Sequence, residues 1–295
     1  MTGAERGFLL LTAHLGDSGR KPLTVAQFRE LTKLAQRMEK PLCDRDLTAG
    51  DLMELGCRPD FAWRVCDLLE EETRLDRYLS QAEGLDCYPL TRLNPLYPSR
   101  VRKHLDLDAP GCLWAKGDVS VLTQPMISLV GSRDLRSENE AFAAELGKQA
   151  ALQGYTLVSG NARGADSVAQ DSCLANGGTV VSVVADALGG HEIRERVLYL
   201  SEDDFDQDFS AQRAISRNRI IHTLGEKTFI AQCTMEKGGT WDGTVKNLRF
   251  GWSPVFCFDD GSEAVRELIQ RGADKVDFED LSNIAEISSV VISMD

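Results

Sequence analysis

The stretch MISLVGSR, from Met126 to Arg133, decides the fold: a short, mostly apolar run ends in a small-residue turn. Four further apolar runs follow it, separated by stretches with helical periodicity. Such runs are typical of strands buried on both faces, and their alternation with helices implies a parallel sheet with right-handed crossovers. The sequence therefore predicts a doubly wound, Rossmann-like α/β fold. The predicted strands cover residues 126–130, 155–158, 179–184, 228–231 and 255–258, and the predicted helices cover 138–153, 165–176, 211–224 and 243–251.

The region before residue 89 differs, because its apolar residues follow helical spacing throughout. Two threonines there have Gln or Asp three residues later, which is the spacing of capping boxes at helix starts. These pairs are Thr24 with Gln27 and Thr48 with Asp51, and a longer helix is predicted over residues 60–82. Prolines at Pro89, Pro95 and Pro98 break any helix and mark the connection. We predict a small all-α domain over residues 1–88 and the α/β domain over residues 89–295.

The composition, with 42% hydrophobic and 27% charged residues, is ordinary for a globular protein in the cytoplasm. No apolar stretch reaches membrane-spanning length. The patch Phe8-Leu9-Leu10-Leu11 lacks a basic flank and a cleavage site, so it predicts a core helix and no signal peptide. The cysteines form no CxxC pair and histidines are few, which predicts reduced thiols, no metal and no cofactor. The cysteines are Cys43, Cys57, Cys66, Cys87, Cys112, Cys173, Cys233 and Cys257.

A net charge of −13 counts against a broad nucleic-acid-binding surface, because affinity for the phosphate backbone comes largely from Lys and Arg. A local basic groove remains compatible with this charge, since binding depends on where the charges sit. The acidic segment 202–208 has neither the glycine nor the closing glutamate of a calcium loop. We expect it to be a solvated loop.

Three small-residue turns follow predicted strands, and in a doubly wound sheet such turns meet at the ligand-binding edge. Glycines let backbone N–H groups approach an anion, and each following helix adds the positive end of its dipole. Together the turns predict a phosphate site, although none matches the dinucleotide or P-loop pattern. The turns are Gly131-Ser132-Arg133, Ser159-Gly160-Asn161-Ala162-Arg163-Gly164-Ala165-Asp166 and Lys237-Gly238-Gly239-Thr240-Trp241-Asp242-Gly243-Thr244.

A fourth candidate feature is Arg217-Asn218-Arg219, which is followed by two isoleucines. On a helix, residues two apart point in different directions, so we expect one arginine to face the ligand and the other to anchor the loop. The apolar neighbours indicate that this segment is partly buried.

These motifs resemble the DNA-processing protein A (DprA/Smf) family in order and approximate spacing. The resemblance rests on Gly131-Ser132-Arg133, on the turn from Ser159 to Asp166, and on Arg217-Asn218-Arg219. Tyr97-Pro98 and the stretch 113–117 resemble the family's lead-in to its first strand. The helical segment resembles a sterile-alpha-motif-like or helix-hairpin-helix domain. The resemblance extends from about residue 9 to about residue 281.

The resemblance implies an extended Rossmann fold that binds single-stranded DNA, forms a dimer and delivers DNA to a RecA-type recombinase during transformation, without enzymatic activity. No C-terminal winged helix is expected. The ligand pocket carried over by position contains Gly131, Ser132, Arg133, Ser159, Gly160, Gly164, Asp166, Arg217, Asn218 and Arg219, to which the turns add Arg163, Gly238, Gly239 and Thr240. Asp166, an anion, is expected to orient other groups.

Two alternatives stay open from the sequence. One is a sensor of the SLOG type that binds a nucleotide-derived signal in the same pocket, for example in phage defence. The other is a phosphoribohydrolase similar to the LOG family, whose Gly-Gly-x-Gly-Thr turn resembles Gly238-Gly239-Thr240. That family uses a nearby glutamate, where this chain has only Asp242, and no catalytic triad is recognisable. Binding without catalysis is therefore the favoured interpretation.

Overall fold

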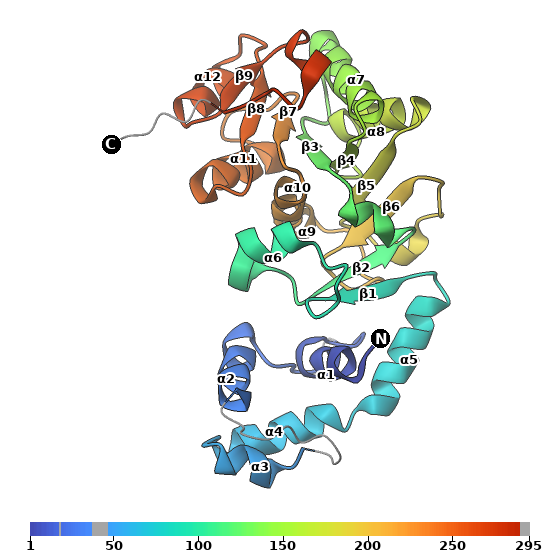
Figure 1. Ribbon diagram of the computed structural model, residues 1–295, viewed down its shortest axis with the longest axis vertical. Coiled ribbons are helices and arrows are strands. Elements are labelled where there is room, and N and C mark those ends of the chain that lie inside the picture. Colours follow the sequence, from blue (N-terminus) through green and yellow to red (C-terminus); the bar gives the residue numbers. More distant parts are fainter. Residues whose placement is uncertain (18, 37–46, 290–295) are drawn as a thin grey trace. The chain divides into compact units, whose positions relative to one another are not determined.

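The computed structural model describes residues 1–17, 19–36 and 47–289 (Figure 1). By its internal contacts the chain divides into two compact units. The first contains Met1–Leu85 and Thr91–Pro95, and the second contains Asp86–Leu90 and the described chain from Leu96 onward.

The first unit is helical. Its helices are α1 (Gly3–Thr12), α2 (Val25–Ala35), α3 (Ala49–Glu54), α4 (Pro59–Leu69) and α5 (Glu72–Glu83). Both predicted capping boxes are present, and the four residues 8–11 are buried in α1 as expected of a core helix. The single helix predicted over 60–82 is wrong, because the chain breaks between α4 and α5. The break allows the Glu71 carboxylate to accept a hydrogen bond from the buried Arg20 guanidinium at 3.0 Å.

The second unit is built on one sheet, whose described strands have the order β1-β2-β6-β5-β4-β3-β7-β8-β9. Neighbours from β6 across to β9 pair in parallel, while β2 is antiparallel to β6. The predicted α/β class with a mostly parallel sheet is confirmed. The strands are β1 (Tyr88–Thr91), β2 (Cys112–Lys116), β3 (Met126–Val130), β4 (Thr156–Ser159), β5 (Thr179–Val183), β6 (Val197–Ser201), β7 (Thr228–Ile230), β8 (Val255–Phe258) and β9 (Asp274–Val276).

The order of strand addition reverses at β3. The chain adds β4, β5 and β6 on one side of it and then returns to add β7, β8 and β9 on the other (Figure 1). A reversal of this kind leaves a crevice at the carboxyl ends of the strands that flank it.

The helices of the second unit are α6 (Ser99–Leu105), α7 (Ser137–Leu152), α8 (Ala165–Ala175), α9 (Ala211–Ser216), α10 (Asn218–Leu224), α11 (Gly238–Phe250) and α12 (Glu263–Gln270). Short 3-10 turns occur at Asp106–Asp108, Val119–Thr123, Leu188–Gly190 and Asp280–Asn283. Two helix predictions are corrected. The helix predicted over 211–224 is divided at Arg217, and the helix predicted to start at Gly243 starts at Gly238. Gly238 has a φ of 81°, a left-handed conformation that glycine adopts without strain.

Helices α7 and α8 pack closely against each other and against the central strands, while α10 packs on β3 from the other side (Figure 1). The contact between α7 and α8 depends on Gly147. A Cβ atom at this position would lie 2.1 Å from the carbonyl oxygen of Ala169, so the two helices meet backbone to backbone.

Gly147→Ala is expected to lower the free energy of unfolding by about 1–3 kcal/mol, because the added methyl group forces two packed helices apart. Urea unfolding measures this. Gly190→Ala is the matched control, since no atom lies within 4 Å of the Cβ position there. Equal stability of the two variants would contradict the close packing.

Candidate functional site

A cavity of about 510 Å³ lies at the strand reversal, and we call it the main cavity. The turns after β3 and β7, the break between α9 and α10 and the start of α11 line it. The structure thus brings together segments that are far apart in the sequence. The predicted residues that line it are Gly131, Ser132, Arg133, Asp166, Arg217, Asn218, Gly238, Gly239 and Thr240.

Two glycines let the turns after β3 and β4 touch. A Cβ atom on Gly131 would lie 2.4 Å from the Cβ atom of Ala165, the first residue of α8. Gly164 has a φ of 89°, and a Cβ atom there would lie 2.4 Å from the carbonyl oxygen of Arg133. The turns are joined by a hydrogen bond from the Ala165 N–H to the Ser132 carbonyl at 3.1 Å. Side chains at either glycine would push the turn that carries Arg133 away from α8.

Arg217 is the buried cation of the site. Only 7% of this residue is exposed, and its Nη1 donates a hydrogen bond to the Val183 carbonyl at the end of β5. Its Nε has no hydrogen-bond partner among the described residues. Burial lowers the pKa of Arg217, and the carboxylate of Asp166 opposes this effect. Arg217 stays charged, because the ordinary pKa of a guanidinium lies far above neutral pH.

Asp166 and Arg217 meet in the space that Gly160 leaves open. A Cβ atom on Gly160 would lie 2.3 Å from Nη1 of Arg217 and 2.4 Å from Oδ2 of Asp166. The Asp166 carboxylate also accepts a hydrogen bond from the Ala162 N–H at 3.2 Å. Burial raises the pKa of Asp166 to about 6, against the effect of Arg217, which favours the ionised form. The Asp166 carboxylate thus lies buried beside the Arg217 guanidinium, and its orienting role stays a prediction.

Two exposed cations border the main cavity without partners. The side chains of Arg133 and Lys237 make no hydrogen bond or ion pair with the described residues, so both are available to an anion. Arg163, by contrast, pairs with Asp134 at 2.9 Å. The two side chains of that pair are 77% and 89% exposed, so the pair contributes little to stability.

The first turn of α11 forms one wall. Lys237 precedes the helix, and no side chain caps the N–H groups of the first turn. The turn is held from both sides: Thr240 Oγ1 donates to the Gly131 carbonyl at 2.9 Å, and Asn218 Nδ2 donates to the Gly239 carbonyl at 2.8 Å. Uncapped N–H groups at the positive end of a helix dipole bind anions.

Five predicted residues do not line the main cavity: Gly160 and Gly164 lie between β4 and α8, Arg163 lines another cavity, and Ser159 and Arg219 lie elsewhere. Ser159 is fully buried, and its Oγ accepts a hydrogen bond from Gln170 at 2.7 Å. Arg219 lines a different cavity and pairs with Glu202. Arg217 and Arg219 therefore point to different surroundings, as predicted, and Arg219 is held by Glu202. That one of the two faces a ligand stays a prediction. The Glu202 side chain is only 5% exposed, so the expected solvated loop over 202–208 is wrong at this residue.

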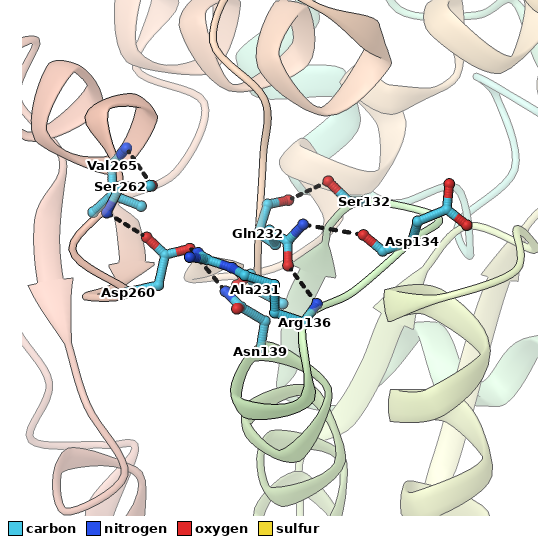
Figure 2. A network of polar contacts seen from close by, with 9 residues as sticks. All are labelled: Ser132, Asp134, Arg136, Asn139, Ala231, Gln232, Asp260, Ser262 and Val265. Carbon is cyan, nitrogen blue, oxygen red and sulfur yellow. Dashed lines mark hydrogen bonds and ion pairs between the residues drawn. The ribbon is translucent and has the colours of Figure 1, made fainter.

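A polar network that was not predicted from the sequence supports the turn after β3 (Figure 2). The Gln232 side chain accepts from the Arg136 N–H at 2.9 Å and donates to the Asp134 carbonyl at 3.0 Å. Arg136 also pairs with Asp260, which follows β8. The network thus connects the ends of β3, β7 and β8 and fixes the loop that carries Arg133. The sequence signal for Gln232 is its position directly after a predicted strand, and this position does not identify its partners.

The cysteines and acidic residues do not form a metal site within the described ranges. The seven described cysteines form no disulfide with one another, and burial raises the pKa of Cys173 to about 11 and that of Cys233 to about 12. The thiols of Cys173 and Cys233 therefore stay protonated at neutral pH. Cys43 lies outside the described residues. No described helix has the length and apolar character needed to span a membrane.

The fold and the cavity define a class: Rossmann-like proteins with a polar cavity at the strand reversal. Comparison with known proteins is more specific. The family model of DNA recombination-mediator protein A matches residues 89–287, so the chain belongs to this family, DprA/Smf.

Relatives and solved structures agree with this membership. The chain is 27% identical to the DNA processing protein DprA of Streptococcus pneumoniae over 248 residues, 78% of this chain and 84% of that protein. It is 27% identical to Bacillus subtilis DprA over 68% of this chain and 71% of the relative. The X-ray structure of S. pneumoniae DprA has a TM-score of 0.72 at 24% identity, covering 98% of this chain and 99% of that one.

A second solved structure is that of DprA from Helicobacter pylori, and it concerns the single-stranded DNA binding mode of that protein. It has a TM-score of 0.56 at 20% identity, covering 67% of this chain and 94% of that one. Both structures confirm the fold.

Asp166 is expected to make stability depend on pH. Its pKa is about 6 in the folded state against an ordinary 3.8, so the folded state binds the proton more tightly between these values. Stability should therefore fall as pH rises from about 4 to about 6 and then stay level. Asp166→Asn should lose this slope in denaturation curves measured across the range. Asp134→Asn, which changes an exposed carboxyl, should keep it. An unchanged slope in Asp166→Asn would contradict the burial argument.

Proposed function

We propose that this chain binds single-stranded DNA at the main cavity and acts in DNA processing, as its family membership indicates. The observation that carries the proposal is the convergence of the unpaired Arg133 and Lys237 with the uncapped start of α11. Phosphate groups are the anions that such donors bind best. The structure of H. pylori DprA, which concerns single-stranded DNA binding by that protein, supports the same ligand.

The acidic net charge of −13 is compatible with this proposal. Two acidic residues are already paired with arginines: Asp134, which lines the cavity, with Arg163, and Glu202 with Arg219. The cavity itself has three cationic residues, Arg133, Arg217 and Lys237, against Asp134 and Asp166. A few phosphate contacts in one pocket, rather than a basic surface, are the expected mode of binding.

We also propose, from the family, that the chain forms a homodimer and delivers the strand to a RecA-type recombinase. The helical segment 1–88 and the segment 89–295 are proposed to be its two domains. Among the alternatives, catalysis is not favoured. Asp242, the carboxylate that a phosphoribohydrolase would need, is exposed on α11 and does not line the main cavity.

Arg133→Ala is expected to weaken binding of a single-stranded oligonucleotide tenfold or more, because it removes a charged hydrogen-bond donor to phosphate. The same substitution should leave the melting temperature unchanged, since this side chain is exposed. Fluorescence anisotropy at several salt concentrations measures both the affinity and the salt slope, which should become shallower by about 0.7 for one lost phosphate contact.

Arg266→Ala is the matched control, an exposed arginine on α12 that lines neither the main cavity nor its neighbours. Duplex DNA should bind more weakly than a single strand, and mononucleotides more weakly still. Equal affinity for duplex and single strand would refute the proposal, and tight binding of a mononucleotide alone would favour the sensor.

No release of free base is expected when the chain is incubated with nucleoside monophosphates. Stabilising the positive charge that develops on the ribose requires a carboxylate at the bound sugar, and Asp242 lies outside the cavity. Chromatography of the nucleotides detects the reaction. Turnover that disappears in Asp242→Asn would establish the hydrolase instead.

A further inference from the structure

Gln170 is a buried polar side chain to which the proposed function gives no role. Only 7% of this residue is exposed, and it lies on α8 four residues after Asp166. Residues four apart share one face of a helix. The face of α8 that supplies the carboxylate beside Arg217 therefore also supplies an amide, although Gln170 does not line the main cavity.

The amide of Gln170 contacts the turn after β4. Its Nε2 donates one hydrogen bond to Ser159 Oγ at 2.7 Å and another to the Gly160 carbonyl. A carbonyl can only accept, so the nitrogen of this amide, and not its oxygen, faces Gly160. The same carbonyl accepts from the hydroxyls of Ser159 and Ser182 at 3.3 and 3.4 Å, and both serines are fully buried. We call Gln170, Ser159 and Ser182 the polar triad.

The polar triad joins three elements at one peptide group. Ser159 ends β4, Ser182 is its register partner on β5, and Gln170 lies on α8. The Gly160 carbonyl therefore receives donors from both strands and from the helix. A rotation of this peptide would leave buried donors without an acceptor, which costs free energy. The triad thus fixes the orientation of the Gly160 peptide.

Another side of Gly160 faces the charged pair of the site. The position of a Cβ atom on Gly160 is 2.3 Å from Nη1 of Arg217 and 2.4 Å from Oδ2 of Asp166, so this backbone lies directly against both side chains. The same Nη1 donates to the carbonyl of Val183, the residue that follows Ser182 on β5. A shift of the Gly160 peptide would therefore displace the guanidinium from a carbonyl that lies next to the triad.

We propose that Gln170 is a positioning residue, which holds the Gly160 peptide and thereby keeps the Arg217 guanidinium in place at the main cavity. This inference rests on the proposed function, because it identifies what fixes one of the cations that the DNA phosphates are proposed to meet. Gln170 acts through Gly160 and not through contact with the strand, since it lines neither the main cavity nor the cavity beside it. A purely structural role would lower stability alone, whereas a positioning role also changes the affinity and the surroundings of Arg217.

The first test is the affinity for a thymidine oligonucleotide, measured by fluorescence anisotropy. Gln170→Met keeps a similar side-chain volume and removes the hydrogen-bond donor. It should weaken binding about tenfold or more, because a phosphate loses a charged donor that is held in place. Gln170→His keeps an N–H donor on the same helix face and should restore most of the affinity.

The second test follows the Arg217 guanidinium itself. Its N–H groups are buried, so they should exchange slowly with water and give resolved signals in nitrogen–proton correlation spectra. The Arg217 signals are assigned as those missing in Arg217→Lys. They should shift or disappear in Gln170→Met and return in Gln170→His. A loss of stability elsewhere in the chain would not move them.

Gln153→Met is the matched control, the same substitution at a glutamine that donates to the Leu281 carbonyl at 2.8 Å and lines neither cavity. It should lower the melting temperature and leave the affinity and the Arg217 signals unchanged. Should Gln170→Met not fold, Gln170→Asn takes its place, because this change keeps the amide and withdraws it from Gly160 by one methylene group.

The melting curve of each variant shows that it is folded. Wild-type affinity in folded Gln170→Met or Gln170→Asn, or unchanged Arg217 signals, would overturn the positioning role and leave the proposed function standing. Failure of the wild-type chain to bind the strand would overturn both.

Discussion

A buried guanidinium, that of Arg217, holds the site together. Burying a charge is costly unless it finds partners, and here two segments supply the partners and a third leaves the space. Val183 at the end of β5 accepts a hydrogen bond, Asp166 at the start of α8 supplies the opposite charge, and Gly160 after β4 leaves the room. This explains why the predicted helix 211–224 is divided at Arg217. An unbroken helix would lack the break at which this side chain turns inward.

The glycines of the three turns act first on backbone packing. Gly131 and Gly164 allow the turn after β3 to touch the start of α8, and Gly160 makes room for the charged pair. Gly131 also lines the cavity, as do Gly238 and Gly239 at the start of α11. Glycine therefore has two roles here: it brings the strand ends close enough to share one cavity, and it exposes N–H groups within that cavity.

The sequence predicted the parts of the fold that have a local signal. The five predicted strands are present because each is a buried apolar run at the centre of the sheet. Strand β6 (Val197–Ser201) was missed although it is fully buried, since charged residues on both sides obscured it, and β9 (Asp274–Val276) is too short to show a period. The side-chain network of Gln232 and Asp260 depends on which strand ends become neighbours, and no local pattern contains that information.

The effect of the chain's acidic charge on ligand binding depends on which carboxylates pair with arginines in the structure. By the negative charge of its sequence alone, the segment 202–208 counts against a phosphate ligand. In the structure Glu202 pairs with Arg219 and Asp203 pairs with Arg213, so two carboxylates of this segment are partners of arginines. Arg213 also donates hydrogen bonds to the Asp208 carbonyl and the Gln207 side chain. Arg133 and Lys237, which have no such partners among the described residues, keep their charge for a ligand. A protein with a strongly negative net charge can thus present a positive pocket, because pairing decides which charges remain available.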